Sequence, residues 1–172
     1  MTNKIIENEL LPIKKIIYDT CNFQLLNLKV EKESKEYNAC SFELDKSKIL
    51  FRTAKITPTK TGQFVTFWKR IENGPIEPFN SSDEIDFFVV NVHKDDLSGQ
   101  FVFPKSVLSK KGIITTQLKE GKRAFRVYPP WDITTSKQAI NTQKWQLNYF
   151  LEISANESID LNRAKKLYSL NQ

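Results

Sequence analysis

Two dense runs of β-branched and aromatic residues, IDFFVVNV at 85–92 and GQFVF at 99–103, constrain the fold of this chain most strongly. Runs of this length and composition are typical of strands that are buried on both faces. The polar residues HKDDLS between them predict a surface loop. We therefore expect the core to form around a sheet with these two strands at its centre.

Shorter strand signals lie on either side of this centre. Residues 38–45 alternate apolar and polar side chains, and a polar turn then precedes a strand from Ile49, which predicts a hairpin. Pro58 and Gly62 bracket the loop TPTKTG, after which QFVTFWKRI at 63–71 resumes the alternation of a strand. RAFRVY at 123–128 predicts a last strand before two prolines.

Helical spacing occurs at both ends of the chain. One face of an amphipathic helix is predicted with Pro12 as a kink or boundary, formed by Ile6, Leu10, Ile13 and Ile17. Residues 105–112 predict a short helix. The order of helix, strands and helices predicts an α+β fold, a single domain over residues 1–172 with helices covering a mixed or antiparallel sheet.

Two further helices are predicted after residue 132. The first is expected to have Asp132, Thr134, Thr135 or Ser136 as its cap and runs through KQAINTQKWQLNYFLE, with Ile140, Leu147 and Leu151 facing inward. The second spans 159–170 and is expected to have Asn156 or Ser158 as its cap. Its inward positions would be Leu161, Ala164, and Leu167 or Tyr168.

The amino terminus and the cysteines indicate the compartment. Glu7 and Glu9 interrupt the apolar stretch of the amino terminus, which argues against a signal peptide or a membrane span. Cys21 and Cys40 show no metal-ligand spacing and are expected to be reduced thiols rather than a disulfide. We therefore expect a cytoplasmic protein without membrane contact, bound metal or cofactor.

Positive charge is concentrated in two segments. Residues 46–71, the first basic segment, carry seven Lys or Arg and no acid, and residues 105–126, the second basic segment, carry seven against one Glu. The first segment has a net charge of +7 and the second of +6. Because the whole chain has a net charge of only +6, the remaining residues together carry −7. Such segregation can focus a positive potential if the two segments meet in space.

Few residues support catalysis. His93 is the only histidine and is expected to be a surface residue, and no complete phosphate-binding loop is present. A nuclease that uses Mg²⁺ needs converging carboxylates near a lysine, for which the candidates are Asp86 or Glu43 with Lys55 or Lys69. The residues two positions before these lysines are Thr53 and Phe67 rather than acids. Acid-x-Lys does occur at 33–35 and 120–122, but at the frequency expected by chance.

Basic and aromatic residues alternate in both segments, a composition suited to nucleic acid, because cations hold phosphates and exposed rings stack on bases. The alternative is that the aromatic residues are core and the long basic side chains reach solvent along a sheet. The helix from Ser136 adds a polar stripe that starts at Lys137. The candidate nucleic-acid or anion-binding residues are Arg52, Lys55, Thr57, Thr59, Lys60, Gln63, Trp68, Lys69, Arg70, Lys122, Arg123, Arg126 and Lys137.

A family resemblance covers roughly residues 33–150. FRTAKITPTKTGQFVTFWKR, GPIEPF, DFFVV, SGQFVFPK, KRAFRVYPPWD and KQAINTQKWQLNYF together resemble the MepB family of small bacterial proteins. The resemblance implies a core like that of type II restriction endonucleases, with a groove that faces nucleic acid. Its signature residues include most of the binding candidates above, and also Gly62, Trp131, Gln138 and Trp145.

These observations predict a protein that binds DNA or RNA in a groove formed by the two basic segments, without catalysis. Two alternatives remain: a Mg²⁺-dependent nuclease of the restriction-endonuclease type, and a module that binds another protein or a small anion. The direction in which the basic side chains point decides among them.

Overall fold

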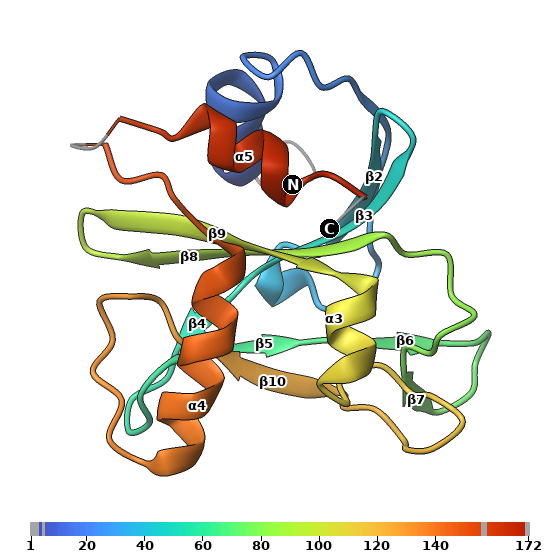
Figure 1. Cartoon of the computed structure of the whole chain (residues 1–172). Coiled ribbons are helices and arrows are strands. Elements are labelled where there is room, and N and C mark those ends of the chain that lie inside the picture. Colours follow the sequence, from blue (N-terminus) through green and yellow to red (C-terminus); the bar gives the residue numbers. More distant parts are fainter. Residues whose placement is uncertain (1–3, 5, 156–157, 171–172) are drawn as a thin grey trace.

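A six-stranded mixed sheet forms the centre of the computed structural model, which describes residues 4, 6–155 and 158–170 (Figure 1). The order is β1 (Leu25–Val30), β2 (Cys40–Leu44), β3 (Ser47–Thr53), β8 (Phe87–Lys94), β9 (Leu97–Pro104) and β11 (Phe150–Glu152). β3 and β8 are parallel, and the other neighbours are antiparallel. The predicted α+β class with a mixed sheet is confirmed, and the two apolar runs, as β8 and β9, are central strands.

Two small sheets form a second layer. One has the order β10 (Ala124–Val127), β5 (Gln63–Thr66) and β4 (Lys55–Ile56), and the other pairs β6 (Trp68–Arg70) with β7 (Ile76–Pro78). The single strand predicted over 63–71 is therefore wrong, because the ladder breaks at Phe67. The Phe67 ring is fully buried and stacks on Phe88 of the central sheet, with 4.2 Å between ring centroids.

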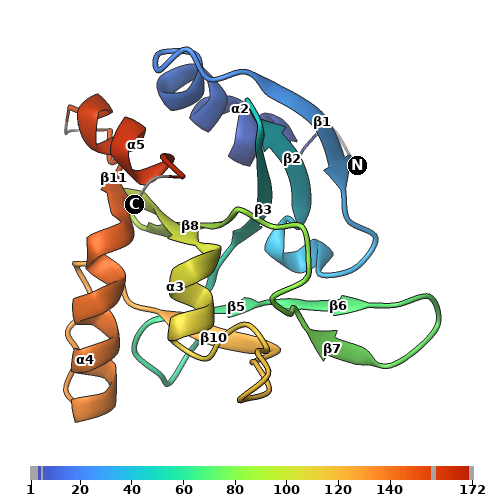
Figure 2. The same cartoon turned by 45° about the vertical axis from the view of Figure 1, so that its right-hand side comes forward.

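The helices cover both faces of the central sheet (Figures 1 and 2). On one face lie α5 (Leu161–Leu167) and the helical amino-terminal segment, which consists of η1 (Ile6–Leu10), α2 (Leu11–Ile13) and η2 (Lys14–Tyr18). On the other face lie α3 (Lys105–Lys110), α4 (Lys137–Gln146) and the small sheet of β10, β5 and β4. Short η3 (Lys35–Tyr37) and η4 (Leu147–Tyr149) complete the structure. In the described part of the chain, no helix is long and apolar enough to cross a bilayer.

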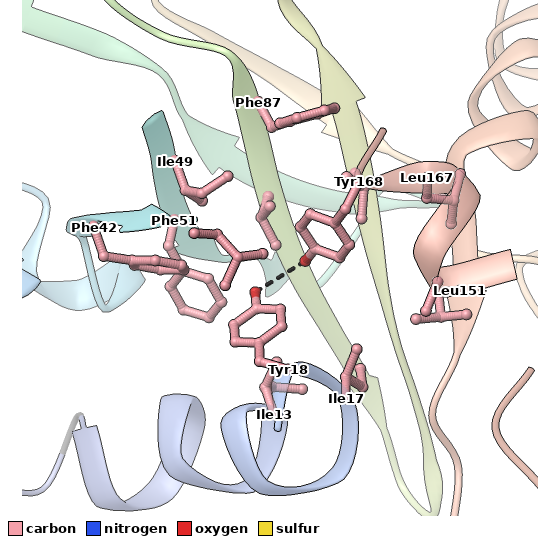
Figure 3. Close-up of a cluster of buried hydrophobic side chains, with 14 of the residues drawn as sticks. Ile13, Ile17, Tyr18, Phe42, Ile49, Phe51, Phe87, Leu151, Leu167 and Tyr168 are labelled. Atoms are coloured by element: carbon pink, nitrogen blue, oxygen red, sulfur yellow. Dashed lines mark hydrogen bonds between the residues drawn. The ribbon is translucent and has the colours of Figure 1, made fainter. Parts of the chain in front are cut away.

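The hydrophobic core under α5 includes Tyr18 and Tyr168, whose hydroxyls are joined by a hydrogen bond (Figure 3), and this bond belongs to a buried chain of polar groups. The hydroxyls of Tyr18 and Tyr168 lie 2.9 Å apart, Tyr168 donates to Gln100, and Gln100 donates to Asn91 at 3.0 Å. Because every member has a partner, these groups can be buried without the cost of an unpaired polar atom. They join the amino-terminal segment, α5 and the two central strands.

The carboxy-terminal helices differ from the prediction. Of the four candidate caps, Ser136 caps α4, since its Oγ accepts a hydrogen bond from the Ala139 N–H, but α4 ends at Gln146 rather than near residue 152. Residues 150–152 form β11, which pairs with β9, and Ile140 is 46% exposed rather than inward. The cap of α5 is Asp160, not Ser158, and Asn156 lies outside the described residues. Ala164, Leu167 and Tyr168 face the core as expected.

Candidate functional site

The two basic segments meet where β10 pairs with β5. The register places Arg126 directly opposite Phe64, and Phe64 in turn lies opposite Lys55 of β4. Directly opposed residues in adjacent antiparallel strands project from the same face. The opposite face, with Val65 and Phe125, packs in the core, so Lys55, Phe64 and Arg126 form one row across the other face of this sheet.

Cations and rings alternate along this row. The Lys55 Nζ lies 5.0 Å from the centre of the Tyr37 ring, and the rings of Tyr37 and Phe64 are 6.3 Å apart. The guanidinium carbon of Arg126 lies 5.8 Å from the centre of the Phe64 ring. Contacts of this kind hold cationic side chains in place without neutralising their charge. The basic and aromatic alternation of the sequence is thus a spatial array.

Arg126 also organises the TPTKTG loop. Its Nη2 donates to the Thr57 hydroxyl at 2.7 Å, and its Nη1 donates to the carbonyls of Thr61 and Gly62 at 3.4 and 3.2 Å. Gly62 has φ of +83°, and a Cβ there would lie 2.7 Å from the Tyr128 ring, which explains why this position requires glycine. Arg126 therefore shapes the site as well as charging it.

A hollow of about 280 Å³, here called the β10 hollow, lies beside the free edge of β10, between α4 and the end of α3. Its cations are Lys111, Lys122 and Arg126, and no Asp or Glu of the described chain lines it. Lys111 Nζ lies 5.3 Å from the centre of the Trp145 ring, which forms part of the wall. The signature residues Lys122, Arg126, Gln138 and Trp145, far apart in sequence, thus share one hollow.

Gln146 anchors α4 to this edge of the sheet. Its Oε1 accepts a hydrogen bond from the Tyr128 N–H at 2.8 Å, and its Nε2 donates to the Arg126 carbonyl at 2.9 Å. The side chain is fully buried and continues the ladder of β10 in place of another strand. Sequence reasoning missed this residue, because nothing in the local pattern distinguishes it from the exposed Gln138 or the half-buried Gln143 of the same helix.

Other candidates lie away from the β10 hollow, so the predicted residues do not form a single groove. Arg52 is 3% exposed. Lys69 contacts the carboxylates of Asp83 and Glu77 at 2.8 and 3.5 Å, and Arg70 contacts Glu33 at 2.8 Å. Together with Trp68 these three basic residues line a second hollow, near η3 and β6.

The remaining candidates are dispersed. Thr59 and Lys60 belong to the TPTKTG loop, where they line a hollow with Trp131. Gln63 is buried on the inner face of β5 and donates to the His93 carbonyl, so it is not a surface binding residue. Lys137 is exposed at the start of α4, and Arg123 pairs with Glu120 at 3.2 Å.

The nuclease candidates are not assembled into one site. Asp86 Oδ2 accepts a hydrogen bond from the Lys48 N–H at 2.7 Å, where it fixes the start of β8. Glu43 accepts a hydrogen bond from Asn27, and Lys55 and Lys69 have the separate partners described above. Across residues 4, 6–155 and 158–170, no three His, Cys, Asp or Glu side chains gather in a group that could hold a metal ion.

His93 is paired rather than isolated. Its Nε2 lies 3.1 Å from Glu9 Oε2, and that carboxylate also accepts a hydrogen bond from Thr53. Burial acts to raise the pKa of Glu9, but the hydrogen bond and the charge of His93 hold it below its usual value. The hydrogen bond to Glu9 raises the pKa of His93. This pair connects η1 to the end of β8. Neither Glu9 nor His93 lines the β10 hollow.

Comparisons with known proteins agree on one family. A family model described as MepB-like matches residues 31–152. A crystal structure of MepB is 41% identical in sequence, with a TM-score of 0.73, over 77% of this chain and 88% of the solved chain. A comparison with curated proteins gives no match.

Proposed function

The chain belongs to the MepB-like family, and from this premise we propose that it binds nucleic acid along β10 and the β10 hollow. Two observations carry the proposal: the two basic segments pair at β10 and β5, and β10 also borders a hollow whose described lining includes three cations of the second segment and no carboxylate. Phosphates are held by this kind of cationic surface, and the affinity is then salt-dependent through counterion release.

The aromatic residues favour contact with unpaired bases. Trp145 and Tyr128 line the hollow, and the half-buried Phe64 lies on the outer face of the small sheet, where it packs near the buried Tyr37 ring. Base–aromatic stacking combined with cations that follow the backbone is the usual basis of single-strand binding. We accordingly expect single-stranded DNA or RNA to bind more tightly than a duplex of the same length.

The proposal extends to a core like that of type II restriction endonucleases, supported by the mixed sheet with helices on both faces. It does not extend to cleavage. Asp86 and Glu43 have separate structural partners, and the carboxylates nearest Lys69 neutralise its charge. We propose binding without catalysis. Degradation of the oligonucleotides that requires Mg²⁺ would instead identify the protein as a Mg²⁺-dependent nuclease.

Fluorescence anisotropy with labelled oligonucleotides tests the proposal. We expect binding at low salt that weakens steeply as salt increases. The triple variant Lys55→Ala, Lys111→Ala and Lys122→Ala should weaken binding and lower the slope of log affinity against log salt by about 0.7 for each phosphate that is no longer neutralised. A matched control, Lys14→Ala, Lys15→Ala and Lys165→Ala, removes the same charge from the amino-terminal segment and α5.

The control separates a defined interface from a general attraction to a basic protein. If both triple variants lose the same affinity, the interface along β10 is incorrect. Absence of binding by the wild-type protein at low salt would refute nucleic-acid binding altogether.

A further inference from the structure

The second hollow, here called the Arg52 hollow, has a volume of about 440 Å³ and shares no lining residue with the β10 hollow. One wall is the end of β1 and the segment leading to η3, and the other is β6, with Leu50 and Arg52 of β3 between them. Its volume is within the range of small-molecule sites in proteins.

Arg52 is a buried cation with unused hydrogen-bonding capacity. Its Nη1 donates to the carbonyl of Phe51 at 3.0 Å, whereas its Nε, which is also buried, has no hydrogen-bond partner within the described chain. No acidic side chain of the described residues lies within ion-pairing distance of the guanidinium. A buried donor without an acceptor destabilises a fold, and an acceptor supplied by a ligand removes that cost.

The charged residues around Arg52 are of both signs. Lys29, Lys32, Lys69 and Arg70 also line the hollow, and Lys69 and Arg70 are already held by acids. The acids in the lining are Glu31, Glu33 and Glu72. Ser41 donates to Glu31 at 3.1 Å, and Arg70 contacts Glu33.

Trp68 and Phe79 provide apolar surface next to these charges. The Trp68 ring is only partly buried, and the guanidinium carbon of Arg70 lies 5.7 Å from its centre. A ring in this position can stack on a planar ligand. Glutamate side chains repel a bare inorganic anion but accept hydrogen bonds from amino or hydroxyl groups, so the lining favours an organic ligand over a simple ion.

We propose that the Arg52 hollow binds a small organic anion whose carboxylate or phosphate accepts hydrogen bonds from the Arg52 guanidinium. The planar or apolar part of this ligand lies against Trp68, and its amino or hydroxyl groups donate to the glutamates of the lining. A guanidinium is suited to both headgroups, because carboxylate and phosphate oxygens match its fork of donors.

Titration calorimetry with defined probes tests the site and identifies the headgroup. The probes are inorganic phosphate, acetate, the four common nucleoside monophosphates, and free aromatic and acidic amino acids. We expect one-to-one binding of at least one organic probe, tighter than that of phosphate or acetate. Preference for the nucleotides identifies a phosphate ligand, and preference for the amino acids identifies a carboxylate ligand.

Two variants assign the binding to this hollow. Arg52→Lys keeps the charge but loses the fork of donors, and it should weaken binding by about tenfold or more. Trp68→Phe keeps the packing of an aromatic ring and should remove the fluorescence change that accompanies binding. If Arg52→Lys does not fold, as judged by circular dichroism, Trp68→Phe and Lys32→Ala still test the site.

The outcomes are distinct from those for nucleic-acid binding. Lys55→Ala with Lys122→Ala should leave small-anion binding unchanged, and Trp68→Phe should leave oligonucleotide binding along β10 unchanged. The proposal is overturned if no organic probe binds at ~10 mM, if the folded Arg52→Lys variant or, where that does not fold, Lys32→Ala binds the probes as tightly as wild type, or if the fluorescence change persists in Trp68→Phe. In that case Arg52 serves only the stability of β3.

Discussion

Replacing Gln146 by Met should destabilise the protein strongly, because the buried amide makes both hydrogen bonds that attach α4 to β10. Methionine has similar length and volume but cannot replace the acceptor for the Tyr128 N–H or the donor to the Arg126 carbonyl. Both backbone groups would remain in an interior where the side chain of residue 146 is fully buried. Leaving a buried polar group unpaired costs about 1–3 kcal/mol, so the two effects together should amount to roughly 2–6 kcal/mol.

Denaturation in urea, followed by tryptophan fluorescence, measures this change. For a chain of this size, a decrease of roughly 2–6 kcal/mol in the free energy of unfolding corresponds to a melting temperature lower by roughly 4–24 °C. Gln138→Met is the matched control, because Gln138 lies in the same helix but is exposed, and its replacement should change stability by less than about 0.5 kcal/mol. If Gln146→Met is as stable as this control, the amide does not hold α4 against β10, and the β10 hollow must be built in another way.

Three further predictions concern other parts of the fold. The Glu9–His93 pair stabilises the protein most at pH values above the unfolded-state pKa of Glu9, about 4.5, and below that of His93, about 6.5. Its contribution is lost as the pH falls through the lowered pKa of Glu9 in the folded state. It is also lost as the pH rises through the raised pKa of His93 in the folded state. The difference in unfolding free energy between wild type and His93→Gln should therefore decrease between about pH 6 and pH 8. The decrease should be less than about 1 kcal/mol, because the imidazole is half exposed. A difference that does not vary with pH would contradict a stabilising Glu9–His93 pair. Gly99→Ala should cost several kcal/mol in urea denaturation, since its Cβ would lie 2.9 Å from a carbonyl oxygen of β11 and closer still to an aromatic ring there; unchanged stability would show that β11 can move away from β9. Burial raises the pKa of Cys21, and that of Cys40 to about 12, so a thiol reagent at neutral pH should label both only after unfolding, and fast labelling of the native protein would argue against this core.

The elements that the sequence predicted best are those that local pattern alone specifies. The apolar runs 85–92 and 99–103 contain no exposed residue and form most of β8 and β9, whose exposed residues lie only at the ends that meet in their hairpin. The alternation before the turn at Asp45 defines the hairpin of β2 and β3. Asp45 has φ of +55°, a conformation that aspartate tolerates better than most residues. The cap at Ser136 likewise acts within one turn of the helix that it starts.

The errors occurred where a distant partner overrides the local pattern. The helical spacing around Leu147 continues past residue 146, which predicts a longer helix. In the structure, however, residues 150–152 pair with the edge of β9 and form β11. Similarly, QFVTFWKRI alternates as one strand, but the stacking of Phe67 on Phe88 draws the chain into the core and ends β5. Neither β9's edge nor the position of Phe88 can be inferred from the segments that they reorganise.

The same principle decides which positive charge can reach a ligand. The first basic segment contains no acid, yet Lys69 and Arg70 are neutralised by Asp83, Glu77 and Glu33, which lie outside that segment. An acid-free stretch of sequence therefore becomes an acid-free surface only where the segments that it contacts also lack acids. Beside β10, which pairs with β5 of the first basic segment, the hollow has no Asp or Glu among its described lining residues. Local charge counts located the two basic segments, and the proposed binding surface follows only from how they pair in the fold.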